Sequence, residues 1–259
     1  QRQQEQQAAA AAAEADKGRM NRLTSMMRKS GGVRRASGGE KAAGKAAESA
    51  SAKADAGPTQ LARIVRGDIA KTSEFRWIRL KKIFYTDEKG VERQWEAAER
   101  TTRRADADAV FIIAMLHKAG KEPEVLLVSQ FRPPVDSYVL EFPAGLIDKG
   151  ETAGDAGLRE LMEETGYTGT IKQVSPIVVA DSGMTNANLQ YVHIDVDLDA
   201  PENLNPKARP DEGEFIESHR VPRNRLFEVA SDPSKLQTKR NAPLVCDARL
   251  FSVAMGLGM

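Results

Sequence analysis

Three glutamates in one short segment, Glu160, Glu163 and Glu164, are the residues of this sequence whose spacing points most directly to chemistry. The composition of residues 152–165 predicts a helix, on which Glu160 and Glu164 lie on one face, about 6 Å apart along the axis. Like charges at this spacing repel one another. Clustered carboxylate oxygens are, however, the ligands that hard cations such as Mg²⁺ require. The segment indicates either a cation site or a solvated acidic helix, and three glutamates alone favour the second interpretation.

The residues around these glutamates change that balance. They follow the spacing G-x5-E-x7-R-E-U-x-E-E-x-G-U, in which U is apolar. The positions are filled by Gly145, Glu151, Arg159, Glu160, Leu161, Glu163, Glu164, Gly166 and Tyr167. This pattern resembles the Nudix box, with every fixed position occupied. The resemblance implies an α/β/α sandwich with a mixed sheet, and hydrolysis of a nucleoside diphosphate linked to another group.

The same resemblance implies a role for each residue of the box. Glu160 and Glu164 would be the main ligands of Mg²⁺, which Mn²⁺ could replace, and Glu163 would be a further ligand or a near neighbour. The backbone carbonyl of Ala144 would also reach a metal ion. Arg159 and Glu151 would support these ligands by orienting the carboxylates. Gly145 and Gly166 would support them by permitting a tight backbone.

Segments outside the box narrow the substrate class. Residues 130–134, 141–148 and 213–215 resemble the ADP-ribose (ADP-sugar) pyrophosphatase branch of the family, and they are closest to its eukaryotic members. The resemblance implies hydrolysis of ADP-ribose to AMP and ribose 5-phosphate. The alternatives are another nucleoside diphosphate derivative as substrate, or a non-catalytic module that binds ADP-ribose. A non-catalytic module would be expected to lack one or more of the metal-binding carboxylates, so their presence favours an enzyme.

Further residues match substrate-binding positions of that branch. Trp77 and Trp95, the only tryptophans in the chain, would sandwich the adenine, one from each subunit of a homodimer that exchanges its N-terminal domains. An indole ring offers a flat face on which a base can stack. Four more residues would contact phosphate or ribose or line the pocket: Arg100, Arg132, Leu146 and Asp181. Core packing of the tryptophans, surface ion pairs of the arginines and a turn at Asp181 are the structural alternatives.

The catalytic group is sought among acidic residues near the box. Glu214, in an acidic loop at 210–214, matches a glutamate that in relatives engages the activated water or a metal ion. A carboxylate within about 3 Å of that water could take its proton. Glu163 and Arg159 are placed with Glu214 in the catalytic group, and Glu212 and Glu163 are the competing candidates for the general base.

Alternating and continuous apolar patterns predict the elements that position these residues. Residues 77–85 and 91–98 read as a hairpin around a turn at 87–90. Continuous apolar runs at 110–116 and 125–128 predict strands that are covered on both faces. Further strands are predicted at 138–142, 171–179 and 191–196, and further helices at 224–230 and 246–257. The order fits a mixed-sheet α/β sandwich preceded by a small antiparallel domain.

Composition divides the chain of 259 residues into unlike parts. Residues 1–58 contain no aromatic residue and are rich in Ala, Ser, Gly and basic residues, which predicts a disordered basic tail. A dimerisation hairpin is predicted for 59–104 and the Nudix domain for 105–259. A single cysteine excludes an intrachain disulfide, and no apolar run reaches the roughly 18 residues of a membrane span. We expect a cytoplasmic or nuclear protein without a membrane or nucleic-acid partner, and leave mitochondrial targeting by the tail open.

Overall fold

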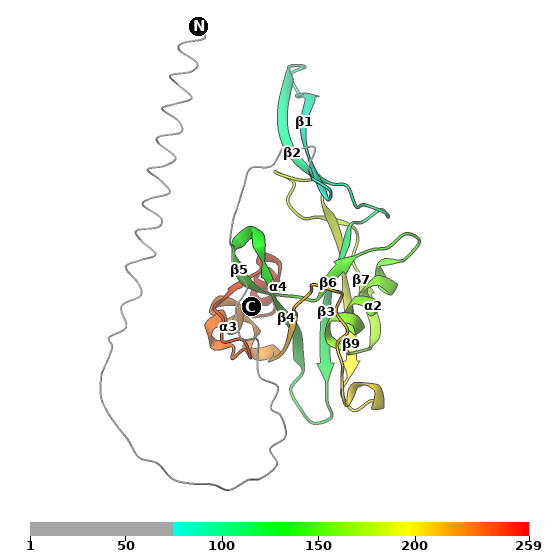
Figure 1. Ribbon diagram of the computed structural model, residues 1–259, viewed down its shortest axis with the longest axis vertical. Helices are drawn as coiled ribbons and strands as arrows, with labels where there is room; N and C mark the ends of the chain where they lie inside the picture. The colour runs from blue at the N-terminus through cyan, green and yellow to red at the C-terminus, as the bar shows by residue number, and fades with distance from the viewer. Residues whose placement is uncertain (1–74, 259) are drawn as a thin grey trace, which may run out of the picture. The chain divides into compact units, whose positions relative to one another are not determined.

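The computed structural model describes residues 75–258, whose elements are traced in Figure 1. The tail predicted for residues 1–58 and the first part of the domain predicted for 59–104 lie outside the described residues. No helix within 75–258 is long and apolar enough to cross a membrane.

A two-stranded antiparallel hairpin opens the described chain. Strands β1 (Ile78–Thr86) and β2 (Glu92–Arg100) pair over their whole length, so that Ile83 faces Trp95. The turn between them is closed by Asp87, whose Oδ1 accepts the backbone N–H groups of Lys89 and Val91 at 2.9 Å. Gly90 adopts a left-handed φ of 77° there, which a residue without Cβ does at little cost. The predicted hairpin is confirmed.

The other strands form one nine-stranded mixed sheet. Six strands follow the order β11-β5-β4-β3-β9-β7, while β10 pairs with β4, β6 with β3 and β8 with β9. The pairs β3–β9 and β11–β5 are parallel and the others are antiparallel. The strands are β3 (Ala109–His117), β4 (Glu124–Arg132), β5 (Ser137–Glu141), β6 (Ala144–Leu146), β7 (Thr170–Val174), β8 (Val178–Val179), β9 (Asn188–Asp197), β10 (Glu217–Pro222) and β11 (Leu244–Cys246).

Helices cover both faces of this sheet and make the predicted α/β/α sandwich. Helix α2 contacts β3, β7 and β9, whereas α4 contacts β5 and α3 contacts β10. In Figure 1, α2 lies on one side of the sheet and α3 and α4 lie on the other. The helices are α2 (Ala153–Thr165), α3 (Leu226–Ser231) and α4 (Ala248–Gly258). Short 3₁₀ turns lie at η2 (Pro133–Val135), η3 (Pro201–Asn203), η4 (Arg223–Arg225) and η5 (Pro233–Lys235).

The central strands explain why the sequence shows continuous apolar runs. In β3, Val110, Ile112 and Ala114 point into the core beneath α2, while Phe111 on the opposite face belongs to the core beneath α3 and α4. Successive side chains of a strand point to opposite faces, so a strand buried on both faces must be apolar at every position. The predicted strands at 110–116 and 125–128 are confirmed.

Three short strands, one break in a strand and the start of one helix differ from the sequence-based expectation. The strand predicted at 171–179 is two strands, β7 and β8, with Pro176 between them, and proline has no N–H to give to a sheet ladder. The helix predicted from 246 begins at Ala248, because Cys246 still belongs to β11. Strands β6, β10 and β11 were not predicted, since each is short and depends on a partner strand distant in sequence.

Candidate active site

Helix α2 carries the glutamates and has well-defined ends. Thr152 is the N-cap, and its hydroxyl oxygen accepts the backbone N–H of Asp155 at 3.2 Å. Gly166 ends the helix in a left-handed conformation (φ 77°) and donates its N–H to the carbonyl of Met162 at 2.8 Å. A Cβ at Gly166 would also lie 2.2 Å from the backbone nitrogen of Lys207. The predicted helix is confirmed, and the glycine position of the box is explained by backbone geometry and close packing together.

Two glycines inside α2, Gly154 and Gly157, have a packing role that the sequence does not reveal. A Cβ at Gly157 would lie 3.0–3.2 Å from three side-chain atoms of Val192, and one at Gly154 would lie 2.9 Å from Cδ1 of Ile171. Glycine at these positions lets α2 pack closely against β7 and β9. The cost of glycine inside a helix, about 1 kcal/mol relative to alanine, is offset by this close packing on the sheet.

Gly145 is the residue most tightly constrained by the carboxylates. A Cβ built there would lie 1.9 Å from Cδ and 2.0 Å from Oε1 of Glu160, so any other residue would displace the carboxylate. Gly145 lies in β6, which pairs with β3 and holds this stretch of backbone beside α2. The next residue towards the N-terminus, Ala144, donates its N–H to Oε2 of Glu164 at 3.3 Å. Strand β6 and helix α2 therefore bring the box glycine, the Ala144 backbone and two of the glutamates together.

Arg159 holds several box residues in place. Its guanidinium donates two hydrogen bonds of 2.9 Å to Glu151, one of 2.8 Å to Glu160 and one of 3.0 Å to Glu163. It also donates to the carbonyl of Leu146 at 3.0 Å, which ties β6 to the helix. Glu151 in turn accepts the N–H of Asp148 at 3.1 Å. These contacts agree with the orienting role that the resemblance implies for Arg159 and Glu151.

The electrostatics of Glu160 and Glu164 favour a cation nearby. Burial, followed by the charges of Glu160, Glu214 and Glu141, raises the pKa of Glu164 to about 8, against a hydrogen bond from Ala144. Burial also raises the pKa of Glu160, in spite of its contact with Arg159. A bound divalent cation would favour the ionised form of both carboxyl groups.

The donor set fits a metal ion that is shared with substrate. Within residues 75–258 no three His, Cys, Asp or Glu side chains are arranged to enclose a metal ion by themselves. Mg²⁺ does not need such a cage, because it usually takes one or two carboxylates together with water and substrate phosphates. The nearby oxygens of Glu160 and Glu164 supply that number of carboxylates.

A cavity of about 790 Å³ lies over this carboxylate surface. Its wall contains most of the residues predicted from the sequence: Arg100, Arg132, Ala144, Gly145, Leu146, Arg159, Glu160, Glu163 and Glu214. Arg132 is held by an ion pair of 2.9 Å with the buried carboxylate of Glu141, which also lines the cavity. The structure thus brings residues from the hairpin, from six strands of the large sheet, from α2 and from the 210–214 loop to one cavity.

The position of the 210–214 loop relative to the cavity distinguishes its two glutamates, Glu212 and Glu214. Glu214 lines the cavity and is close enough to Glu160 and Glu164 to raise the pKa of each, whereas Glu212 is not part of the wall. A turn places Glu214 there, since its N–H donates to the carbonyl of Asp211 at 3.0 Å and its carboxylate accepts the N–H of Asp211 at 3.3 Å. Among the two loop glutamates, this arrangement favours Glu214 as the candidate base.

Three predicted substrate residues do not line the cavity of the single chain. Trp77 and Trp95 are about half exposed on the hairpin, and Trp95 donates its Nε1–H to the carbonyl of Gly183 at 2.9 Å. Trp95 lies opposite Ile83, six residues from Trp77, so the two indoles are roughly 20 Å apart along the ribbon. One chain cannot place both rings on one adenine. Asp181 sits in a turn, where its carboxylate accepts the N–H of Gly183 at 3.2 Å.

Residues of the C-terminal segment were missed by the sequence analysis. Asp247 and Arg249, together with Phe111 of β3, line the same cavity, and Arg249 stacks 4.2 Å from the centre of the Phe111 ring. No motif or periodicity marks these residues, because their place in the cavity depends on β11 pairing with β5. An Asp-x-Arg sequence at the start of the helix predicted for 246–257 is the only signal that could have drawn attention to Asp247 and Arg249.

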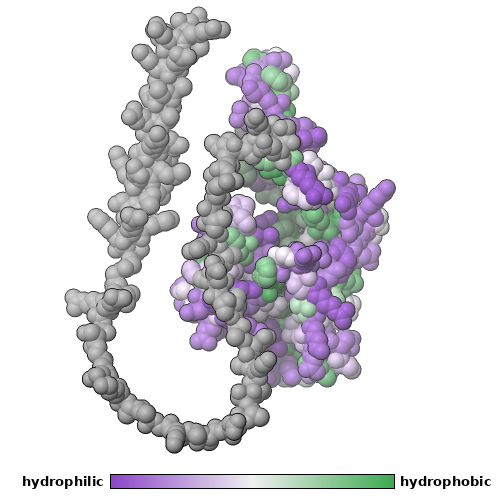
Figure 2. Space-filling view, in the orientation of Figure 1, coloured by the Kyte–Doolittle hydropathy of each residue, from purple (hydrophilic) through white to green (hydrophobic). Residues whose placement is uncertain are grey.

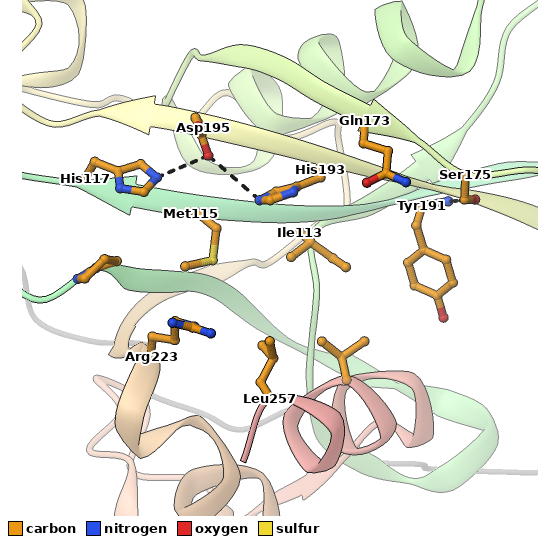
Figure 3. A pocket seen from close by; sticks show the side chains of 12 residues that line it. Ile113, Met115, His117, Gln173, Ser175, Tyr191, His193, Asp195, Arg223 and Leu257 are labelled. Atoms are coloured by element: carbon orange, nitrogen blue, oxygen red, sulfur yellow. Dashed lines mark hydrogen bonds and ion pairs between the residues drawn. The ribbon is translucent and has the colours of Figure 1, made fainter. Parts of the chain in front are cut away.

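A second cavity, of about 520 Å³, lies between the sheet and α4 (Figure 3). His117 and His193 flank Asp195 there, with Nε2 to Oδ1 distances of 3.1 and 3.8 Å. The Asp195 carboxylate also pairs with Lys172 at 3.3 Å. This cavity has one carboxylate in its wall, already partnered by cationic or imidazole groups, so it lacks the means to hold a divalent cation beside a diphosphate. His219 is buried elsewhere and contacts the Ser129 hydroxyl at 2.8 Å.

Comparisons with known proteins agree with the fold and the box. A family model of the NUDIX domain matches residues 106–243. An ADP-ribose pyrophosphatase of Saccharomyces cerevisiae is 44% identical over 193 residues, covering 74% of this chain and 81% of the relative. An ADP-sugar pyrophosphatase of Mus musculus is 44% identical over 156 residues, covering 60% of this chain and 72% of the relative. An uncharacterised Nudix hydrolase of Schizosaccharomyces pombe is 43% identical over 188 residues, covering 72% of this chain and 88% of the relative.

A solved structure supports the same fold. A crystal structure of an ADP compounds hydrolase superposes with a TM-score of 0.50 at 21% identity, covering 74% of this chain and 86% of that one. Together with these relatives, the sandwich and its carboxylate helix define the class of protein as a hydrolase. The chain belongs to the Nudix family.

Proposed function

We propose that this protein hydrolyses the diphosphate of ADP-ribose and related ADP-sugars to AMP and a sugar phosphate, which is ribose 5-phosphate for ADP-ribose, with Mg²⁺ as cofactor. The observation that carries the proposal is the cavity above Gly145, whose wall joins Glu160 and Glu163 of α2 to Arg100 and Arg132. Glu164 is buried on the same helix and is not itself part of the wall. Relatives named ADP-ribose or ADP-sugar pyrophosphatase, each 44% identical, support the choice of substrate.

Each residue group has a distinct part in the proposed reaction. Glu160, Glu164 and the Ala144 carbonyl would hold Mg²⁺, with Glu163 beside them, and Mn²⁺ could replace it. When bound, the metal supplies positive charge against the diphosphate and lowers the pKa of a bound water. Arg159 fixes the directions of the glutamates through the contacts described above.

Glu214 takes the proton of the attacking water in this proposal. The water oxygen forms a bond to one phosphorus, the bridging P–O bond breaks, and the electrons of that bond stay on the departing phosphate. Arg100 and Arg132 donate hydrogen bonds to phosphate or ribose oxygens, for which a guanidinium fork is suited. Leu146, about two-fifths exposed in the cavity wall, offers apolar contact to the substrate.

The hairpin completes the site in a homodimer. Its apolar residues are exposed in one chain, and its two indoles are too far apart to hold one base, so two hairpins are needed to place an indole on each face of the adenine. We therefore propose exchanged N-terminal domains within residues 59–104, with 105–259 as the hydrolase domain. Asp181 would contact substrate only if its turn moved towards the cavity.

A product-release assay tests this function. Wild-type protein with Mg²⁺ is offered ADP-ribose, other ADP-sugars, UDP-sugars, NADH and dinucleotide polyphosphates, and the products are separated by chromatography. The expected result is the highest kcat/KM for ADP-ribose, with activity lost in chelator and restored by Mg²⁺. Carrying out the reaction in ¹⁸O-labelled water then shows which product receives the water oxygen. A clear preference for a UDP-sugar or a dinucleotide would contradict the substrate assignment, and activity in chelator would contradict the metal assignment.

A further inference from the structure

The C-terminal segment forms one side of the candidate active-site cavity. Strand β11 pairs in parallel with β5, and Asp247 then leads into helix α4. Residues 245–249 all line the cavity. The match to the NUDIX family model ends at residue 243, so this segment lies outside the matched range.

Arg249 is the residue of this segment best prepared to bind a ligand. Its guanidinium forms a two-pronged ion pair with Asp247, with Nε to Oδ1 at 2.9 Å and Nη2 to Oδ2 at 2.6 Å. Asp247 Oδ1 also accepts the backbone N–H of Arg249 at 2.8 Å, which ties the pair to the start of α4. The guanidinium carbon lies 4.2 Å from the centre of the Phe111 ring. These contacts hold the fork in one orientation.

The Arg249 guanidinium retains unused donors. Nη1 has no hydrogen-bond acceptor among the residues that the structure describes, while Nε and Nη2 are both engaged. The side chain is 36% exposed, and it reaches the cavity wall. An ordered cation with free N–H groups in a cavity is suited to oxygen-rich ligands, since charge-assisted hydrogen bonds are stronger than neutral ones.

The position of Arg249 relative to the carboxylates indicates which part of a substrate it meets. Phe111 pairs with Ala144 in the β3–β6 ladder, so Arg249 stacks on the residue next to the proposed metal-binding backbone. Arg132, on the neighbouring β4, faces the same cavity. The hairpin, which carries the indoles proposed for the adenine, contacts the 183–187 loop instead. The C-terminal side is thus left for the other half of the diphosphate.

We propose that Arg249 binds the sugar phosphate half of the substrate through Nη1, and that Asp247 and Phe111 position its guanidinium. The acceptors are the hydroxyl and phosphoryl oxygens of that half. This inference rests on the proposed function, because it assumes a nucleoside diphosphate sugar in the cavity. It makes Arg249 a specificity-determining residue that separates ADP-sugars from ADP derivatives without a sugar.

Product inhibition separates the two halves of the substrate experimentally. KM and kcat for ADP-ribose with Mg²⁺, and the inhibition constants of AMP and of ribose 5-phosphate, are measured for wild type, Arg249→Met and Arg249→Lys. Loss of a charge-assisted hydrogen bond is expected to raise KM and the inhibition constant of ribose 5-phosphate about tenfold or more in Arg249→Met. The inhibition constant of AMP stays unchanged, and kcat changes less than KM. Arg249→Lys, which keeps the charge but loses the fork, gives an intermediate result.

Arg225→Met is the matched control, since Arg225 also forms an ion pair at the start of a helix, with Glu228 at 3.2 Å, but lies outside the cavity. Its kinetic constants should equal those of wild type. The melting temperature of each variant is measured as well. If Arg249→Met melts at a lower temperature than wild type, the kinetic and inhibition constants of Arg249→Lys decide the question instead.

The outcomes test the binding role of Arg249 separately from the proposed hydrolysis of ADP-ribose. Unchanged KM and ribose 5-phosphate inhibition in an active Arg249→Met protein overturn the inference alone. A rise in the AMP constant instead places Arg249 on the nucleotide half and also overturns it. Absence of ADP-ribose turnover by the wild-type protein overturns the proposed function, and the inference fails with it.

Discussion

The hairpin and the centre of the large sheet use apolar residues in opposite ways. In β3 and β4, Val110, Ile112 and Leu127 have no exposed surface, because helices cover both faces of the sheet. In the hairpin, Leu80 is 61% exposed and Phe84 is 58% exposed. Figure 2 shows hydrophobic residues at the surface of the hairpin among polar ones. A single hairpin is only marginally stable in water.

The comparison shows which part of the molecule is complete in one chain. The carboxylate site is built from α2 with Glu151 before it, from β5 and β6 and from the 210–214 loop, and its contacts are made within one chain. The hairpin touches the rest of the chain through few polar contacts, such as Ala98 N–H to the Met184 carbonyl at 2.8 Å, and leaves its apolar surface uncovered. The first region should therefore bind the metal ion within one chain, whereas the second should need another subunit.

The largest expected effect comes from a change in the carboxylate site. Glu164→Gln removes a proposed metal ligand, and we expect kcat with Mg²⁺ to fall by more than about a hundredfold, since even the outer partners of metal ligands contribute 10–100-fold. Without metal, the melting temperature of the variant should equal or exceed that of wild type. Burial disfavours ionisation of the Glu164 carboxyl group, and Gln carries no charge. Activity assays and thermal unfolding check the two effects separately.

The control for this variant is Glu202→Gln, which alters an exposed glutamate in the first turn of η3 and should change neither quantity. Near-normal kcat in Glu164→Gln would remove Glu164 from the metal site. A large loss of stability without metal would show that the ionised carboxylate is needed by the fold itself.

The next effect tests the region that is incomplete in one chain. Leu80→Glu puts a charge on the exposed apolar face of the hairpin, and burying that charge in a subunit interface would be costly. We expect dissociation into monomers in sedimentation experiments and a fall in kcat/KM of about tenfold or more. That fall would accompany loss of an indole worth roughly 1–3 kcal/mol to base stacking. The melting temperature of the body should change little.

Leu204→Glu is the matched control, since Leu204 is 59% exposed but lies far along the chain, after η3. It should remain in the wild-type oligomeric state. A Leu80→Glu protein that is monomeric yet fully active would show that each chain completes its own site.

The same contrast explains how much could be predicted from the sequence. The box was readable because its chemistry is local: Glu160, Glu164 and Arg159 lie within two turns of one helix whose cap residues also stand in the sequence. Gly145 lies outside that helix, and its fixed spacing marked it before the 1.9 Å approach to Glu160 supplied the reason.

Features that depend on distant pairing could not be predicted in this way. Arg249 reaches the cavity only because β11 joins β5, and Gly157 reads as a flaw in a helix until Val192 is seen packed against it. The strands β6 and β11 have three residues each, too few to show a period.

A smaller effect concerns Trp95 of the hairpin, whose indole is proposed to stack on the adenine. Trp95→Ala should raise KM for ADP-ribose by about tenfold, in line with 1–3 kcal/mol for one stacked base, with Mg²⁺ affinity unchanged. Trp95→Phe keeps a ring but loses the Nε1 hydrogen bond to the Gly183 carbonyl. If Phe restores KM, stacking is the role of Trp95, whereas equal losses in both variants would mean that its anchoring of the 183–187 loop is what matters. Kinetics for ADP-ribose and calorimetric Mg²⁺ titration check both readings.

The smallest effect lies where the hairpin joins the body, at Asp108. Its burial opposes ionisation, but hydrogen bonds from Arg103 and from the N–H of Asn188 outweigh this and lower the pKa of Asp108. A carboxyl group with a lowered pKa in the folded state stabilises it above the ordinary pKa of about 3.9, and this contribution disappears as the pH falls through the folded-state value. Asp108→Asn should therefore lower the melting temperature at pH 7 by roughly 2–4 °C, as about 1 kcal/mol would do in a chain of this size.

The difference in melting temperature between Asp108→Asn and wild type should shrink as the pH is lowered from 6 towards 3. Asp148→Asn is the control, since the Asp148–Arg104 pair of 3.0 Å is exposed on both sides and should contribute almost nothing. A melting-temperature difference that stays constant over this range would mean that Asp108 acts through its shape and neutral hydrogen bonds. In that case the charge of Asp108 would not stabilise the junction, in contrast to the charged contacts of Arg159 that hold the site on α2 together.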